Sequence, residues 1–420
     1  MEVDHQIMAR LGVGVMVVAG LLFGAEWVRS REWGGVRFQR LLQGQLQYGL
    51  AGAVAGYAAP QTWQLPLVDG VHAAVYFLVA WFGLVTGMGL DRRLLSGSQT
   101  ALMVQDVIRA VVVALTVLLA AYAGWRVLAV HLLPVEAVFV LAGVCAALSP
   151  RLVHMRITRT RTPARSGWFS LATCTGALVY GVGAIPLRGG GFDIQLPLLP
   201  DHRLILIEAT PSQMIGCLIL GCLTGLIMDL LTRDAQRRML VFLVGSSLAF
   251  GAGIAVALGL DPVWTGIVAG AWLINSTLRR LEIMQSLDRA DRAARIGLYL
   301  GAGWLVGTGV AMQGISLFIL AGVLFIVTVV RSLGLWGGTR SARWLLESGW
   351  IQVSGKREGD ARLHVGILAL ALAVSLVELL HGDAGIAALA GVMASQWIVL
   401  FLAPVQNSDR YPERIRGRAG

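Results

Sequence analysis

Long apolar segments alternate with short polar connections along the whole chain. A transmembrane helix needs roughly 20 mostly apolar residues, within a range of about 17–25. Thirteen segments approach this pattern: 11–28, 46–60, 70–90, 101–124, 135–150, 168–187, 212–231, 239–260, 262–277, 296–312, 314–331, 363–380 and 385–405. The pattern predicts an all-α polytopic membrane protein with about thirteen transmembrane helices.

Three of these segments, 46–60, 135–150 and 262–277, are short and contain Gly, Ala or Pro. Short or interrupted helices often line the substrate site of a transporter. A tilted but regular helix fits the same pattern, so both interpretations stay open. We expect segment 11–28 to be a retained helix and not a signal peptide, because acidic residues precede it and an arginine cluster follows it.

The basic residues collect in every second connection. Of the 34 Lys and Arg residues, only Arg10, Arg126, Arg188 and Arg203 fall on one side of the alternating pattern. Positive charge is retained on the cytoplasmic side of a membrane. The sequence therefore predicts an outer N-terminus, one transmembrane domain over 1–405, and a short basic cytoplasmic tail over 406–420.

Composition narrows the class of protein further. The chain is 56% hydrophobic and 14% charged, which excludes a soluble globular or disordered chain. Its formal net charge of +10 would suggest a nucleic-acid partner in a soluble protein. Here the charge reports orientation and matches the anionic lipid of the inner leaflet. We expect an integral protein of the bacterial inner membrane, in contact with the lipid bilayer and with no nucleic-acid partner.

Five segments, in order along the chain, carry a resemblance to a known family. They are 77–95 (which contains Gly89-Leu90-Asp91), 137–150 (ending Ala147-Leu148-Ser149-Pro150), 170–177 (Ser-Leu-Ala-Thr-Cys-Thr-Gly-Ala), 258–276 and 329–334 (Val-Val-Arg-Ser-Leu-Gly). Together they resemble the cation/proton antiporters of the sodium/proton exchanger type, at corresponding spans and spacings.

The resemblance implies an inverted-repeat fold with a dimerisation domain and a core domain that moves like an elevator. The core would contain the segments 135–150, 168–187, 314–331 and 363–380, with 135–150 and 363–380 unwound where they cross. It also implies a homodimer. Under this reading the ion-site candidates are Ser149, Cys174, Thr175, Arg331 and Asn275. Asn275 has a plainer interpretation as a helix end before two arginines.

The chain differs from the family at the positions where the family carries its ion-site residues. Gly89, Ser149 and the pair Cys174-Thr175 stand where the family carries acidic residues, and only the basic partner Arg331 is kept. A cation/proton exchanger needs a mid-membrane carboxylate whose pKa is set near the ambient pH. Hydroxyls and a neutral thiol cannot exchange a proton there.

Two other carboxylates approach membrane depth. Asp106 lies three residues before Arg109, and Asp229 lies four residues before Arg233. Residues at these spacings are neighbours on a helix. A local ion pair therefore explains each of them, and each is also an alternative carboxylate for ion exchange.

No enzyme, metal or cofactor signature stands out. The histidines fall near connections or span ends, without catalytic or metal-ligating partners at a suitable spacing. Gly301-Ala302-Gly303 with Gly307 looks like a dinucleotide fingerprint, but no strand precedes it. Close helix packing explains these glycines better.

Two functions remain. The first is a transporter of the antiporter fold that moves monovalent ions, with altered or lost proton coupling. The second is a transport-inactive relative that serves as a membrane scaffold or as a subunit beside a different protein.

Overall fold

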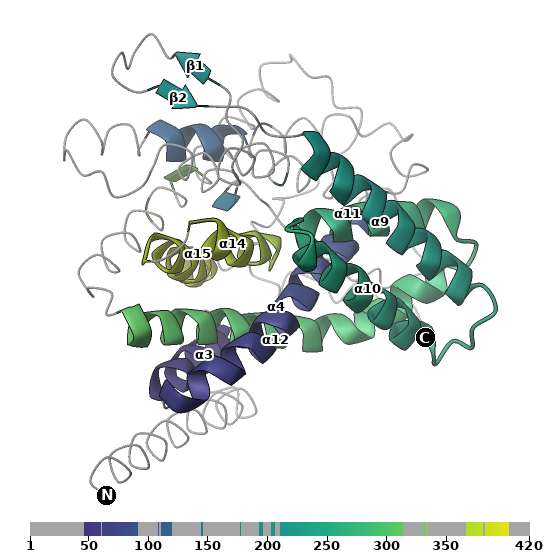
Figure 1. Cartoon of the computed structure of the whole chain (residues 1–420), viewed down its shortest axis with the longest axis horizontal. Coiled ribbons are helices and arrows are strands. Elements are labelled where there is room, and N and C mark those ends of the chain that lie inside the picture. The colour runs from purple at the N-terminus through teal and green to yellow at the C-terminus, as the bar shows by residue number, and fades with distance from the viewer. Residues whose placement is uncertain are drawn as a thin grey trace, which may run out of the picture.

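The computed structural model describes part of the chain. The described residues are 46–59, 61–90, 108, 111–119, 144–145, 177, 193–195, 203–205, 211–313, 329, 333–334, 367–380 and 383–402. The helices are α3 (Leu46–Ala58), α4 (Gln61–Met88), α9 (Pro211–Thr232), α10 (Leu240–Ala257), α11 (Pro262–Ser276), α12 (Arg280–Gln313), α14 (Ile367–Leu380) and α15 (Asp383–Leu402). In Figure 1, α12 runs along the bundle, with α3 near one end and α9 to α11 near the other.

Most predicted spans that can be compared are helical. The eight helices overlap the eight predicted spans in these regions. Within the described ranges, three stretches are long and apolar enough to cross a membrane: Gly70–Met88, Gln213–Thr232 and Leu240–Ala257. The predicted spans 11–28, 135–150, 168–187 and 314–331 lie outside the described residues, isolated positions apart. The span at 101–124 is helical over 111–119.

Two helices begin earlier than predicted. The connection expected at 61–69 is the start of α4, and the basic connection expected at 279–295 forms the first half of α12. Residues 280–295 contain good helix formers, without Gly or Pro. Ile283, Leu287 and Ala294 are buried on one face, so charged residues do not prevent helix formation here. At 34 residues, α12 is about 51 Å long.

The all-α expectation is also incomplete. The predicted outer connection 188–211 contains two short strands, β1 (Asp193–Gln195) and β2 (Arg203–Ile205). They pair antiparallel, with Ile194 opposite Leu204. The hydrophobic pattern misses them because three residues are too few to produce a periodic signal.

A tight turn separates α10 from α11. Gly259 has φ +66°, a conformation that glycine adopts without a steric penalty. The Leu260 amide donates to the Ala255 carbonyl, which closes a Schellman motif. Asp261 then caps α11 by accepting from the Val263 amide at 2.9 Å, and Pro262 occupies the first helical position. The sequence therefore ends one helix and starts the next within four residues.

Glycines bring α3 and α12 into backbone contact. The motif is Gly-x-x-x-Gly on both helices, formed by Gly52, Gly56, Gly303 and Gly307. A methyl group on Gly52 would overlap the Leu300 carbonyl, and one on Gly307 would overlap the Ala53 carbonyl. The expectation that the glycines near 301–307 pack helices together is thus confirmed.

A second pair of helices, α4 and α11, is joined in the same way. Its glycines are Gly83, Gly87, Gly266 and Gly270. A methyl group on Gly266 would overlap the Ala80 carbonyl, and one on Gly87 would overlap the Ile267 carbonyl. Side chains larger than hydrogen are therefore excluded from this interface as well.

The two glycine interfaces match contact for contact. Gly52 meets the carbonyl three residues before Gly303, as Gly266 meets the carbonyl three residues before Gly83. Gly307 and Gly87 likewise occupy equivalent positions in the two interfaces. Exchanging α3 with α11, and α4 with α12, therefore maps one interface onto the other.

The contact registers also give the relative helix directions. α3 and α12 run the same way, as do α4 and α11. α12 runs against α4, because Gly297 lies on Leu78 whereas Gly301 lies on Val75. These directions agree with the alternation predicted for the spans of α3, α4, α11 and α12. The exchange that relates the two interfaces therefore places each helix on a helix that runs in the opposite direction.

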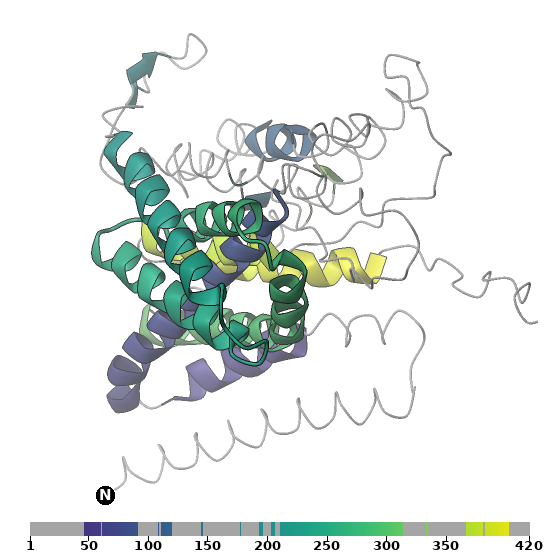
Figure 2. The same ribbon diagram turned by 90° about the vertical axis from the view of Figure 1, so that its right-hand side faces the viewer.

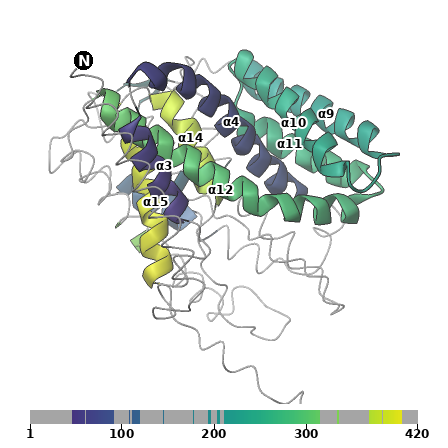
Figure 3. The same ribbon diagram turned by 90° about the horizontal axis from the view of Figure 1, so that it is seen from below.

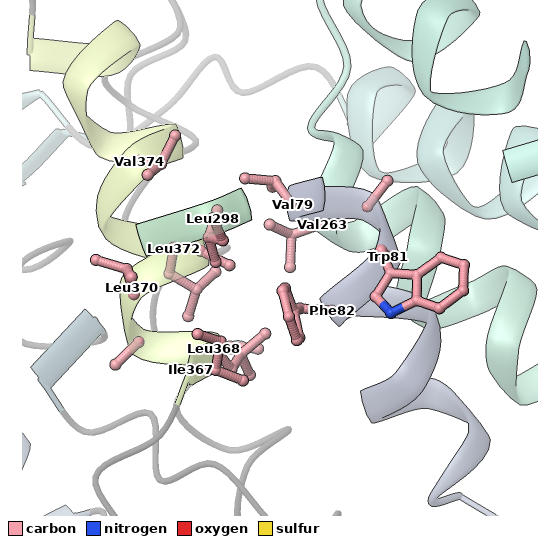
Figure 4. Close-up of a cluster of buried hydrophobic side chains, with 14 of the residues drawn as sticks. Val79, Trp81, Phe82, Val263, Leu298, Ile367, Leu368, Leu370, Leu372 and Val374 are labelled. Carbon is pink, nitrogen blue, oxygen red and sulfur yellow. The ribbon is translucent and has the colours of Figure 1, made fainter. Parts of the chain in front are cut away.

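The helices α14 and α15 lie at the centre of the hydrophobic core. Every residue from Ile367 to Leu376 is buried, and so is every residue from Gly385 to Val392. Figure 4 shows Leu368 and Leu372 of α14 on the side of that helix that faces Phe82 of α4 and Leu298 of α12. The segment expected to unwind at 363–380 is a continuous helix from Ile367 to Leu380.

The helices α9 and α10, in contrast, have many exposed side chains. Figure 2 looks onto the end of the bundle where they lie. Their exposed side chains are large and apolar, among them Leu218, Phe242 and Phe250. A helix that exposes apolar residues while packing on its other side suits contact with lipid chains.

Candidate functional site

Most of the predicted ion site lies outside the described residues. Ser149, Cys174, Thr175 and Arg331 belong to this group, as does the alternative carboxylate Asp106. Their roles stay predictions. Two of the predicted site residues, Asn275 and Asp229, are described, and each has a structural partner.

Asn275 joins the ends of two helices. Its amide nitrogen donates to the Ala271 carbonyl at 2.7 Å and to the Leu90 carbonyl at 3.1 Å. The side chain is exposed, at the end of α11 beside the end of α4. This arrangement satisfies carbonyls that a helix end leaves without partners. The structure thus favours the interpretation of Asn275 as a helix end.

Asp229 forms a local ion pair. Its Oδ2 lies 3.1 Å from a terminal guanidinium nitrogen of Arg233, one turn further along α9. The carboxylate is buried, whereas the arginine is largely exposed. A charge at this depth needs a partner, and Arg233 supplies it. This geometry agrees with the local ion pair predicted from the spacing.

Three serines that the spans place near membrane depth bond to their own helices, whereas the buried Ser375 hydroxyl of α14 has no hydrogen-bond partner. Ser247 donates to the Leu243 carbonyl at 2.7 Å, and Ser246 donates to the same carbonyl at 3.2 Å. Ser276 reaches the Leu273 carbonyl at 3.5 Å. Backbone bonding of this kind is common for serine in helices. These three hydroxyls therefore give no sign of an ion site.

The buried core contains a polar contact that the sequence analysis missed. Tyr299 of α12 donates its hydroxyl to Oε1 of Gln396 of α15 at 2.7 Å, and both side chains are buried. Nearby, Gly49 of α3 lies against Met393, one turn before Gln396. A glutamine in the middle of the predicted span 385–405 was the available signal. Its buried partner could not be identified without the tertiary structure.

A second missed residue is Asp291, in the first half of α12. Its Oδ2 accepts from Nε of Arg295 at 2.7 Å, while Oδ1 is buried without a partner. Asp291 precedes the predicted span 296–312. Burial raises the pKa of this carboxyl, and the Arg295 charge opposes the rise. The sequence pattern placed it in a solvated connection, so its burial was not expected.

Arg279 ties the ends of α9, α11 and α12 together. Its guanidinium donates to the carbonyls of Thr232, Arg233 and Ala235 at the end of α9. It also pairs with Glu282 in the first turn of α12. An arginine at a helix C-terminus satisfies free carbonyls and opposes the negative end of the dipole. Arg279 therefore holds the segment that follows α9 against the segment that joins α11 to α12.

These polar groups limit the chemistry of the described part. Within the described ranges, no group of three or more His, Cys, Asp or Glu residues is arranged to hold a metal ion. Tyr299 and Gln396 are neutral oxygen donors, which can contact a cation but cannot carry a proton across neutral pH. Tyr299 and Gln396 therefore cannot supply a proton exchange themselves.

No protein-family model matches the sequence, and no curated protein matches it. Among solved structures, the chain is similar to the sodium/proton antiporter MjNhaP1 from Methanocaldococcus jannaschii. The two are 16% identical, over 96% of this chain and 98% of that chain, with a TM-score of 0.49. This likeness is too weak to assign the chain to a family.

Proposed function

We propose that this chain is a membrane transporter with an antiporter-like fold that moves monovalent ions. Its apolar helices suit a bilayer, and its ordered motifs resemble those of cation/proton antiporters. The proposal includes about thirteen spans, a homodimer and a moving core domain. Its proton coupling is altered or lost, because the family's acidic positions are occupied by Gly89, Ser149 and Cys174-Thr175.

One observation carries the proposal: the matched glycine interfaces. Exchanging α3 with α11 and α4 with α12 relates them and inverts every helix. Inverted repeats related by an axis in the membrane plane are typical of secondary transporters, whose substrate sites lie near the repeat interface. The symmetry supports an antiporter-like fold, and the flux measurement below separates a working transporter from a transport-inactive relative with the same fold.

Ion flux in proteoliposomes tests the proposal. Purified protein should move Na⁺ or K⁺ under an imposed gradient, with protein-free vesicles as the control. Thr175→Ala should abolish the flux, whereas Asp106→Asn should leave it unchanged. Loss of flux only in the Asp106→Asn variant would assign the ion site to the alternative carboxylate.

The second candidate function is a transport-inactive scaffold or subunit. The missing carboxylates favour it, because cation/proton exchange needs a titratable group near the membrane centre. Purification in a mild detergent would then yield a stable complex with a different protein, and the wild type would give no flux. Flux from the purified chain alone would exclude this candidate.

A further inference from the structure

A basic surface lies at the start of α10. It consists of Arg237 and Arg238, just before the helix, and Arg289 on α12. All three side chains are exposed. Arg237 is held in place, because its guanidinium donates to Oε1 of Gln285 at 2.6 Å. Gln285 lies four residues before Arg289, so these two side chains are neighbours on α12, and Arg237 is bonded to the first of them.

The surface carries excess positive charge. The ion pairs recorded for the described residues join Asp229 to Arg233, Glu282 to Arg279 and Asp291 to Arg295, and none includes Arg237, Arg238 or Arg289. Two exposed acids, Asp234 and Asp288, lie near it in the sequence. Three arginines against two acids leave this surface with a net positive charge, and neighbouring positive charges repel one another. An anion between the arginines would relieve that repulsion.

An exposed apolar face continues directly from the basic surface. Met239 is 54% exposed and Phe242, in the first turn of α10, is 74% exposed. Phe250 continues the face two turns further along the same helix. The N-terminus of α10 adds a favourable dipole, since no side chain caps it.

We propose that this surface binds one acidic phospholipid of the cytoplasmic leaflet. The headgroup phosphate contacts Arg237, Arg238 and Arg289, and the acyl chains lie along Met239 and Phe242. Arginine suits phosphate because its planar guanidinium offers two parallel donors. A soluble anion would use the arginines but gain nothing from the apolar face. The proposal requires a membrane setting but not ion transport.

Thermal unfolding in detergent tests the proposal, with phosphatidylglycerol or phosphatidylcholine added. Phosphatidylglycerol should raise the Tm of the wild type by about 2–4 °C, because a ligand of the folded state stabilises it. Phosphatidylcholine should have little effect. The double variant Arg237→Gln/Arg238→Gln should lose most of the increase. Arg416→Gln/Arg418→Gln, which removes the same charge from the C-terminal tail, should keep it.

Native mass spectrometry provides a second measurement. The wild type should retain one phosphatidylglycerol per chain after delipidation, and the Arg237→Gln/Arg238→Gln variant should retain none. Phe242→Ser should weaken retention while leaving the arginines in place. Equal Tm increases for both lipids, or equal retention by the arginine variant, would overturn the proposal. So would the same Tm increase with inorganic phosphate alone. Lipid binding without ion flux would leave this inference intact and contradict only the transporter.

Discussion

The two glycine interfaces share one backbone geometry but differ in their surroundings. The α4·α11 interface lies inside the bundle, where Trp81, Phe82 and Leu84 are 3% exposed or less. The α3·α12 interface lies at an edge, where Tyr57 is 64% exposed. Figure 3 shows α3 on the outside of α12, whereas α4 crosses the middle of the bundle. The same close approach therefore occurs in two settings that differ in freedom to move.

This difference shows how the surroundings of a glycine determine the effect of substituting it. Close-packed interiors do not accept an added methyl group without strain. An edge helix can shift outward, whereas a helix surrounded by others cannot. The symmetric contacts should therefore respond unequally to the same substitution.

We expect the largest effect from Gly87→Ala in the inner interface. The added methyl group would overlap the Ile267 carbonyl, and neither backbone can move away. The free energy of unfolding should fall by about 2–3 kcal/mol, after allowing for the higher helix propensity of alanine. Unfolding by SDS in mixed micelles measures it. Gly253→Ala, where an added methyl group meets nothing within 4 Å, is the control and should not destabilise the protein.

The corresponding edge substitution, Gly307→Ala, should cost less. Its methyl group would overlap the Ala53 carbonyl, but α3 can move outward to relieve the contact. The same measurement should give a loss of about 1 kcal/mol. Equal losses for Gly87→Ala and Gly307→Ala would contradict the comparison, because they would mean that burial of the pair does not matter.

Tyr299→Phe removes the hydrogen bond that joins α12, and thus the edge interface, to α15. The buried oxygen of Gln396 would lose the hydrogen bond from Tyr299, so stability should fall by about 1 kcal/mol. Tyr57→Phe, at an exposed position on α3, should have no measurable effect. If both variants unfold like the wild type, the Tyr299 contact does not hold α12 in place.

The smallest effect should come from Asp291→Asn, in the half of α12 that precedes its glycines. Because burial raises the pKa of Asp291, the folded protein ionises this carboxyl at a higher pH than the unfolded chain does. The stabilisation is present at low pH and is lost as the pH rises through the folded-state pKa. The Tm of the variant relative to the wild type should therefore increase with pH. A difference that is independent of pH would contradict this assignment.

The sequence predicted much of the framework. Apolar length located the eight described helices, six of them within a few residues at both ends, and the alternation of arginines agreed with the helix directions that the contacts give. It was wrong about the starts of α4 and α12, because polar residues on one face of a helix look like a connection. The sequence predicted less of the candidate site than of the fold. The spacing of Asp229 and Arg233 predicted their ion pair, but nothing local indicated the partners of Gln396 or Arg279.

What the sequence determined by itself is local: where apolar runs begin and end, the Gly259–Pro262 turn, and ion pairs one helical turn apart. These features depend on residues that are close together in the sequence. They also depend on the transfer of an apolar segment into lipid, which does not require contact with the other segments. Only the tertiary structure decided which Gly-x-x-x-Gly helices pair, that α14 is surrounded, and that Asp291 is buried. The reason is that such contacts depend on the surfaces of helices distant in the chain, and no local pattern encodes which surfaces will meet.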